Sequence, residues 1–157
     1  MNDIKISIIN TIEKVSENDW NNCSCPEKSD FSYAIDPFTT YNFLYALEKS
    51  GSVGEKSGWL PYHVLVIESN LIIGVMPLYI KLHSQGEYIF DHNWADAYHR
   101  SGKSYYPKLQ SAVPFSPVTG RRFLSSKGNE DKVREVLIIF LQQHIKEKNI
   151  SSFHITF

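Results

Sequence analysis

The sequence contains few cysteines and no long apolar run. Its only cysteines, Cys23 and Cys25, lie two residues apart. That spacing suits neither a disulfide nor, without a second pair, a four-ligand zinc site. The longest apolar run, LIIGVMPLYI, has ten residues and contains a proline, so it is too short to span a bilayer. The start, MNDIKISIIN, lacks the charged and apolar blocks of a signal peptide. Together these absences favour a reduced, cytoplasmic protein.

The chain also lacks a charge bias and familiar catalytic motifs. The chain has 16 Lys and Arg residues and 17 Asp and Glu residues. The resulting net charge of -1 gives no global attraction to nucleic acid. Neither HExxH nor GxSxG occurs. A length of 157 residues with 42% hydrophobic residues is typical of one globular domain with a real core.

Hydrophobic periodicity predicts an α+β fold, an α/β layer with a central mixed, mostly antiparallel sheet flanked by helices. Ser69-Asn70 is a tight turn that joins two strands into a hairpin. Pro77 cannot donate to a ladder and marks an edge or a bulge. The segments expected in the sheet are 4–9, 62–68, 71–82, 108–124 and 152–157, and EYIF (87–90) is a further short candidate.

Helix signals are clearest near the two ends of the chain. Ser16 followed by Asp19 resembles a capping box, which predicts a helix over 17–23. Asp36-Pro37 predicts the start of a helix over 37–50 that ends at Gly51. The strongest helix spans 130–148, and we expect a helical turn within 92–104. The face of the 130–148 helix expected to pack inward comprises Val133, Val136, Leu137, Phe140, Leu141 and His144.

The stretch HSQGEYIFDHNWADAYHR, residues 83–100, concentrates three histidines, three carboxylates and four aromatic residues. In a helix, His92, Asp96 and His99 would share one face and could bind a metal ion. Alternatively, a carboxylate beside a histidine could transfer protons. Neither interpretation has a supporting motif.

Two further interpretations of this stretch remain open. Trp94, Tyr98, Tyr105 and Tyr106 could form the apolar wall of a ligand groove, with Lys81, Lys108, Arg121 and Arg122 as anion partners. Equally, DHNWAD contains good turn formers, so the stretch could be a structural loop.

The segments LEKSGSVG, GWLPYHVLV and PLYIKLHSQGEYIFDHNWADAYHRSGKSYYPKLQSAVPFSPVTGRR resemble the amino-terminal half of FemAB-like peptidoglycan biosynthesis proteins, over about residues 31–157. That family is placed in the GNAT (N-acyltransferase) superfamily. The resemblance implies a single GNAT-like domain over 1–157 that is the first half of a longer two-domain protein. It also implies transfer of an acyl or aminoacyl group to an amine. A ligand-binding or scaffold domain without catalysis is the alternative.

One segment departs from the superfamily pattern. GNAT enzymes bind the coenzyme A pyrophosphate with a [QR]xxGx[GA] loop before a helix N-terminus, and TGRRFLSSKGNEDKVRE lacks that spacing. Glu130 and Asp131 in the first helical turn would repel phosphate. We therefore expect no cofactor in this half, although acetyl-CoA or aminoacyl-tRNA could serve a complete protein.

The resemblance therefore points to this half as the acceptor-binding half, for a small-molecule or peptide-like acceptor. The terminal strand predicts a homodimer or a missing second half as its partner. No catalytic residue and no metal ligand is assigned. The expected ligand-binding residues are Lys81, His83, Glu87, Asp91, Trp94, Asp96, Tyr98, Tyr106 and Lys108.

Overall fold

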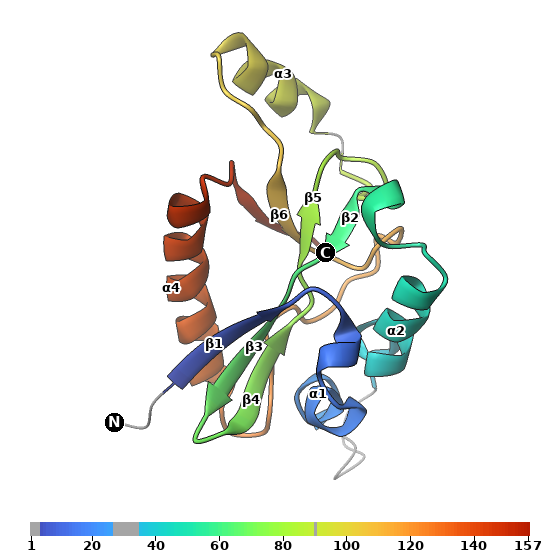
Figure 1. Ribbon diagram of the computed structural model, residues 1–157, viewed down its shortest axis with the longest axis vertical. Helices are drawn as coiled ribbons and strands as arrows, with labels where there is room; N and C mark the ends of the chain where they lie inside the picture. Colours follow the sequence, from blue (N-terminus) through green and yellow to red (C-terminus); the bar gives the residue numbers. More distant parts are fainter. Residues whose placement is uncertain (1–3, 27–34, 90) are drawn as a thin grey trace.

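The computed structural model describes residues 4–26, 35–89 and 91–157. Helices and strands are mixed in an α+β arrangement, which confirms the expected fold class (Figure 1). Cys23 and Cys25 are both free and buried. Within the described residues, no helix has the length and apolar character needed to cross a bilayer.

The first sheet is fully antiparallel, in the order β1 (Ile4–Ile9), β3 (His63–Glu68), β4 (Leu71–Met76) and β7 (Leu124–Ser125). The predicted hairpin joins β3 to β4. Ser69 and Asn70 both have positive φ, 50° and 65°, as a tight turn matching the strand twist requires.

The second sheet is short and mixed, in the order β2 (Trp59–Pro61), β5 (Tyr79–Lys81), β6 (Lys108–Ser111) and β8 (Phe153–Ile155). Its pairs are antiparallel except β6 with β8, which run parallel. Helix α4 lies between these two strands in the sequence, so the connection is a crossover.

The expectation of one continuous sheet is wrong, because two predicted segments divide between the sheets. Segment 71–82 breaks at Pro77, which has no N–H to donate, and Leu78 donates its N–H to His63 Nδ1 at 3.2 Å instead of to a strand. Segment 108–124 likewise forms β6 in one sheet and β7 in the other. Pro114 and Pro117 lie in the irregular chain between them.

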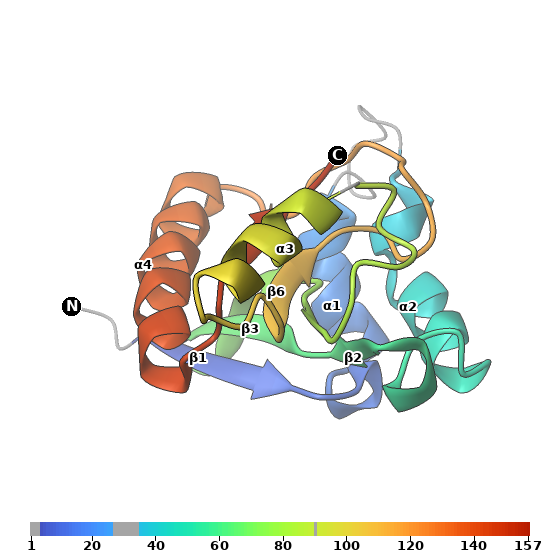
Figure 2. The same cartoon turned by 90° about the horizontal axis from the view of Figure 1, so that it is seen from above.

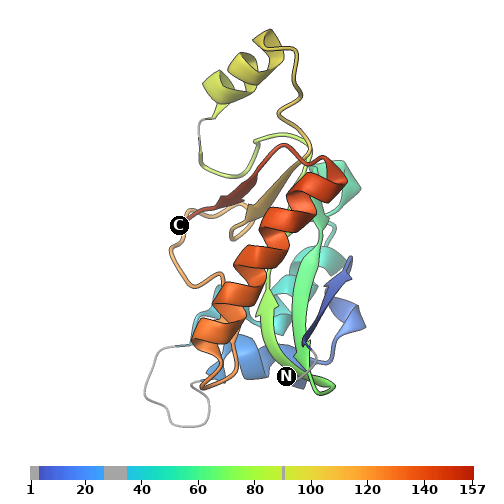
Figure 3. The same ribbon diagram turned by 90° about the vertical axis from the view of Figure 1, so that its left-hand side faces the viewer.

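Helices cover both faces of the first sheet (Figure 2). Side chains alternate along β3, so Val64 and Val66 pack against α4 (Glu130–Lys148), while Leu65 faces α1 (Glu17–Ser24) and α2 (Tyr41–Lys49). Figure 3 shows α4 crossing the sheet diagonally. Its expected inward face is confirmed, with Val133, Leu137, Leu141 and His144 buried and Val136 and Phe140 partly buried.

Ser16 and Asp36 cap helical segments as predicted. Ser16 accepts a hydrogen bond from the Asp19 N–H at the start of α1. The helix expected over 37–50 divides into a 3-10 turn, η3 (Pro37–Thr39), and α2. The cause is Thr40, whose extended backbone ends the turn and whose hydroxyl caps α2. Two more 3-10 turns are η1 (Ile12–Lys14) and η4 (Glu55–Ser57).

Helix α3 (His92–Arg100) projects from the body and has no buried residue (Figures 1 and 3). The predicted helical turn is therefore a nine-residue helix. The strand expected over 87–90 is wrong for residues 87–89, which are bends or irregular chain, and residue 90 lies outside the described residues. Gly86 and Tyr88 have positive φ, which is incompatible with an extended strand.

Candidate functional site

The register of the second sheet places polar side chains in two rows on one face. Trp59 pairs with Lys81, and Lys81 pairs with Lys108. Two residues further along, Gln110 pairs with both Tyr79 and His154. Because residues two apart on a strand point to the same side, both rows share a face. This face is polar although it is buried.

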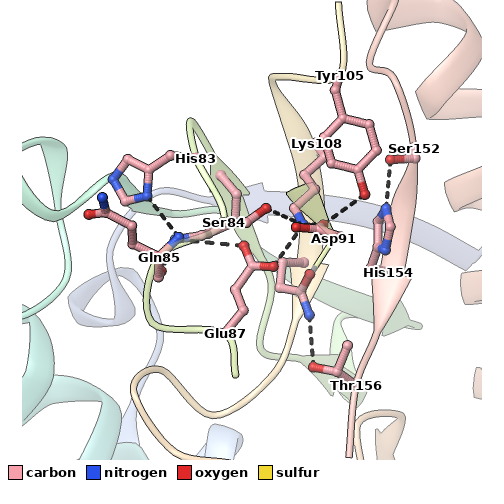
Figure 4. A network of polar contacts seen from close by, with 12 residues as sticks. His83, Ser84, Gln85, Glu87, Asp91, Tyr105, Lys108, Ser152, His154 and Thr156 are labelled. Atoms are coloured by element: carbon pink, nitrogen blue, oxygen red, sulfur yellow. Dashed lines mark hydrogen bonds and ion pairs between the residues drawn. The ribbon is translucent and has the colours of Figure 1, made fainter. Parts of the chain in front are cut away.

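The segment that follows β5 covers this face and supplies acids (Figure 4). Lys108 Nζ donates to Glu87 Oε2 and to Asp91 Oδ2, each at 2.7 Å, and to Ser84 Oγ at 3.2 Å. All four residues are at most 9% exposed. A buried lysine paired with two carboxylates forms the centre of what we call the Lys108 cluster: Lys81, Ser84, Glu87, Asp91, Tyr105, Tyr106, Lys108, Gln110 and His154.

Lys81 is the second buried cation of the cluster. Its Nζ lies 3.8 Å from the centre of the Trp59 ring and donates to the Gln85 carbonyl at 3.1 Å. Glu87 Oε1 is 3.9 Å away. Burial lowers the pKa of Lys81, with Glu87 opposing and Lys108 reinforcing this effect. The Trp59 ring face and the Glu87 carboxylate both favour the ammonium form of Lys81.

The two carboxylates respond differently to burial. Burial alone would raise the pKa of Asp91, but hydrogen bonds from Lys108, Ser84 and Tyr105 outweigh it and lower the pKa to about 2. Tyr105 donates to Asp91 Oδ2 at 2.8 Å, and its own pKa is raised by burial and by this carboxylate. For Glu87, burial outweighs the attraction of Lys108 and raises the pKa. Of the two carboxylates, Asp91 is therefore the one whose ionised form the cluster stabilises.

Partly buried groups border the cluster. The hydroxyl groups of Ser84 and Tyr106 lie 2.7 Å apart. His154 Nε2 lies 2.7 Å from Ser152 Oγ, and burial and Lys108 lower the pKa of His154. An uncharged imidazole at neutral pH can accept a proton, so His154 is the group at this border suited to proton transfer.

Three buried oxygens of the cluster accept no hydrogen bond within the part of the chain that the structure describes. They are Glu87 Oε1, Asp91 Oδ1 and Gln110 Oε1. The Gln110 amide is oriented by its Nε2, which donates to Thr156 Oγ1 at 2.8 Å. An unpaired buried acceptor is costly. Glu87 Oε1 has only the Lys81 ammonium, at 3.9 Å, as an ion-pair partner, so these oxygens retain capacity to accept hydrogen bonds from a group that carries several donors.

The structure brings together only some of the nine predicted site residues. Lys81, Glu87, Asp91, Tyr106 and Lys108 meet in the cluster. Their role in ligand binding stays a prediction.

The other four predicted residues lie at its edge or away from it. His83 packs its ring against Gly58 and accepts the Gln85 N–H at 3.2 Å. The ring centres of Tyr98 and Tyr105 lie 5.2 Å apart in an edge-to-face arrangement. Trp94 and Asp96 are exposed on α3, since the helix turns them away from the sheet.

Sequence reasoning left Trp59, Ser84, Gln110 and His154 out of the site. Only the strand register places Trp59 beside Lys81 and His154 beside Gln110, across 22 and 44 residues of sequence, respectively. The alternation of Lys108 and Gln110 on one strand is the signal that could have added Gln110.

A sequence model of FemAB-like proteins, described as peptidoglycan biosynthesis/recognition, matches residues 11–157. The chain belongs to the FemAB-like family. No curated protein and no solved structure gives a significant match. The two antiparallel-dominated sheets and their helices are compatible with the GNAT-like architecture that the resemblance implies.

In this FemAB-like chain, the start of α4 already holds an acid. The Gly128 N–H donates to Glu130 Oε1 at 3.0 Å, and backbone hydrogen bonds from Glu130 itself and from Gly128 lower the pKa of Glu130. A carboxylate thus occupies the positive end of the helix, where a pyrophosphate would otherwise find free N–H groups.

The alternative metal interpretation finds no matching geometry in the described part of this FemAB-like chain. Over residues 4–26, 35–89 and 91–157, no group of three or more His, Cys, Asp or Glu side chains could hold a metal ion. His92, Asp96 and His99 all lie exposed on α3.

Proposed function

We propose that this chain is an acyl- or aminoacyltransferase-type domain that binds the amine acceptor at the Lys108 cluster. The family, peptidoglycan biosynthesis/recognition, supports a cell-wall acceptor. The observation that carries the proposal is the set of buried oxygens on Glu87, Asp91 and Gln110 that accept no hydrogen bond from the described residues. A primary ammonium has three N–H donors and a positive charge, which complement two carboxylates and an amide.

The proposed entrance lies beside Tyr106 and His154, which are the partly buried residues of the cluster. Transfer requires an uncharged acceptor nitrogen, so the bound ammonium must first lose a proton. The nitrogen then forms a bond to the donor carbonyl carbon as the donor's leaving group departs. His154 is a candidate to take the proton, because its lowered pKa leaves it free to do so.

The acyl donor is proposed to bind outside this half. Glu130 at the N-terminus of α4 supports that division, because it would repel a pyrophosphate. Calorimetry with acetyl-CoA tests it. Tight binding by this chain would contradict the division while leaving the acceptor site open to its own test.

Amine binding is the direct test of the acceptor site. Butylamine and a lysine-containing peptide are titrated into the labelled chain and followed by NMR, with butanol and butyrate as matched compounds without the ammonium group. We expect shifts at Glu87, Asp91 and Gln110 with the amines alone. Asp91→Asn should weaken the affinity for both amines at least tenfold, because one charged hydrogen bond is lost. Glu68→Gln, in a surface ion pair with Lys132, is the control.

A non-catalytic scaffold is the second candidate, and the pairing of Lys108 favours it. Because Glu87, Asp91 and Ser84 already satisfy this ammonium, the cluster can serve simply to fasten the covering segment to the sheet. Equal shifts with butanol and butylamine, or unchanged binding in Asp91→Asn, would support the scaffold and refute the acceptor site.

A further inference from the structure

The helix α3 exposes an aromatic residue that the proposed acceptor site does not use. Trp94 is 67% exposed, whereas Trp20 and Trp59 are fully buried. Tyr88 and Leu82, in the segment leading to α3, are 56% and 47% exposed. Large exposed apolar side chains on α3 and on the segment that leads to it are a feature of interaction surfaces.

Helix α3 is amphipathic although it covers no core. Trp94, Ala97 and Tyr98 share one side at helical spacing, and the opposite side carries polar and charged residues. Of these three residues, only Tyr98 is partly covered, by the Tyr105 ring. The helix therefore presents an apolar side that the rest of the described chain leaves exposed.

Residues 92–104, which are α3 and the chain after it, form what we call the arm, and the exposed charges of the arm favour an anionic partner. Two cations of the arm, Arg100 and Lys103, are exposed, and its single exposed acid is Asp96. Asp91, at the base of the arm, does not count because Lys108 neutralises it. The arm is thus locally basic on a chain whose formal net charge is -1.

We propose that α3 docks on an anionic lipid surface, with Trp94 in the interfacial region and Arg100 and Lys103 beside the headgroups. Tryptophan partitions to the membrane interface, and short basic amphipathic helices lie in its plane. A projecting, convex helix can enter a soft lipid interface directly, whereas a protein partner would need a matching recess. The arm joins the body at Asp91 and Tyr105, so docking brings the Lys108 cluster close to that surface.

The test uses vesicles of phosphatidylglycerol mixed with phosphatidylcholine, compared with phosphatidylcholine alone. Trp94 is the exposed tryptophan, so its emission reports docking. We expect a blue shift and co-sedimentation with the anionic vesicles. Trp94→Ala should lower the partition coefficient about tenfold, by loss of one buried aromatic side chain. Arg100→Gln and Lys103→Gln should each lower it about fivefold on anionic vesicles.

Ile139→Ala is the matched control, because Ile139 is 48% exposed on α4, away from the arm. It should bind as the wild type does. Thermal unfolding of Trp94→Ala checks that the fold is intact. Absence of wild-type binding, or equal binding by Trp94→Ala, overturns the proposal. So does concentration-dependent self-association in light scattering that Trp94→Ala abolishes, since a second copy would then cover the arm. None of these outcomes depends on acyl transfer.

Discussion

The ammonium group of Lys108 lies 2.7 Å from Asp91 Oδ2, although the two residues come from a strand and from the base of a projecting helix. The same ammonium lies 2.7 Å from Glu87 Oε2. Lys108 and Glu87 side chains are fully buried, and that of Asp91 is 5% exposed. One cation thus holds two acids of the covering segment against the sheet.

Removing this cation should be severely destabilising. Lys108→Met leaves two carboxylates buried without their main partner, and we expect a loss of about 3–5 kcal/mol in the free energy of unfolding, as for other broken buried ion pairs. Urea unfolding followed by circular dichroism measures it. Adding Glu87→Gln and Asp91→Asn to Lys108→Met should recover part of the loss.

Lys132→Met provides the comparison. Lys132 pairs with Glu68 at 3.1 Å, but its side chain is 44% exposed. The expected loss is therefore below about 1 kcal/mol. Similar losses for Lys108→Met and Lys132→Met would mean that the Lys108 cluster does not fasten the covering segment.

Asp91 should make folding stability depend on acid pH. Its pKa is about 2 in the folded protein, below the ordinary value of 3.8. The unfolded chain thus binds the proton more readily, and stability falls as the pH drops from about 4 to about 2. The total loss is about 2 kcal/mol, at about 1.4 kcal/mol for each pKa unit. Asp91→Asn should show a shallower decline in urea midpoints over this range, and an identical decline would contradict the folded pKa of Asp91.

Lys81 should make folding stability depend on pH above neutrality, because burial disfavours its charged form. Burial lowers its folded pKa below 10.5, so the unfolded chain holds a proton that the folded chain has released. Stability should therefore rise as the pH increases from about 7, the folded pKa of Lys81, towards its ordinary value of 10.5. Lys81→Met removes the titrating group and should flatten this rise. Lys56→Met, on an exposed residue of η4, should leave it unchanged. A persisting rise in Lys81→Met would assign the effect to another group.

Local patterns predicted local structure well in this chain. Strand 4–9, the Ser69-Asn70 turn and helix 130–148 each depend on neighbours in the sequence, and each is confirmed. The division into two sheets was missed, because it depends on how Pro77 redirects the chain in space. The site shows the same limit. Acids and lysines near one another in sequence were found, but Gln110 and His154 become neighbours only through the parallel pairing of β6 with β8.

Gly74, beside the register shift between β3 and β4, should be intolerant of any side chain. It lies on β4 where a Cβ would overlap the side chain of Val133 on α4. Gly74→Ala should therefore destabilise the fold by about 1–3 kcal/mol, the usual cost of overpacking a core. Val133 is fully buried, so Val133→Ala alone should also be destabilising through a cavity. In the double variant the new methyl group occupies the space that the valine loses. The two losses should therefore sum to more than the loss in the double variant, with a favourable coupling of at least about 0.5 kcal/mol.

Gly102→Ala is a poor substitute control, since its φ of 74° is itself strained for alanine. Ala97→Gly, on the exposed side of α3, tests a small-residue change without packing and should cost about 1 kcal/mol at most. Additive losses for Gly74→Ala and Val133→Ala would show that α4 does not pack on β4 at this point.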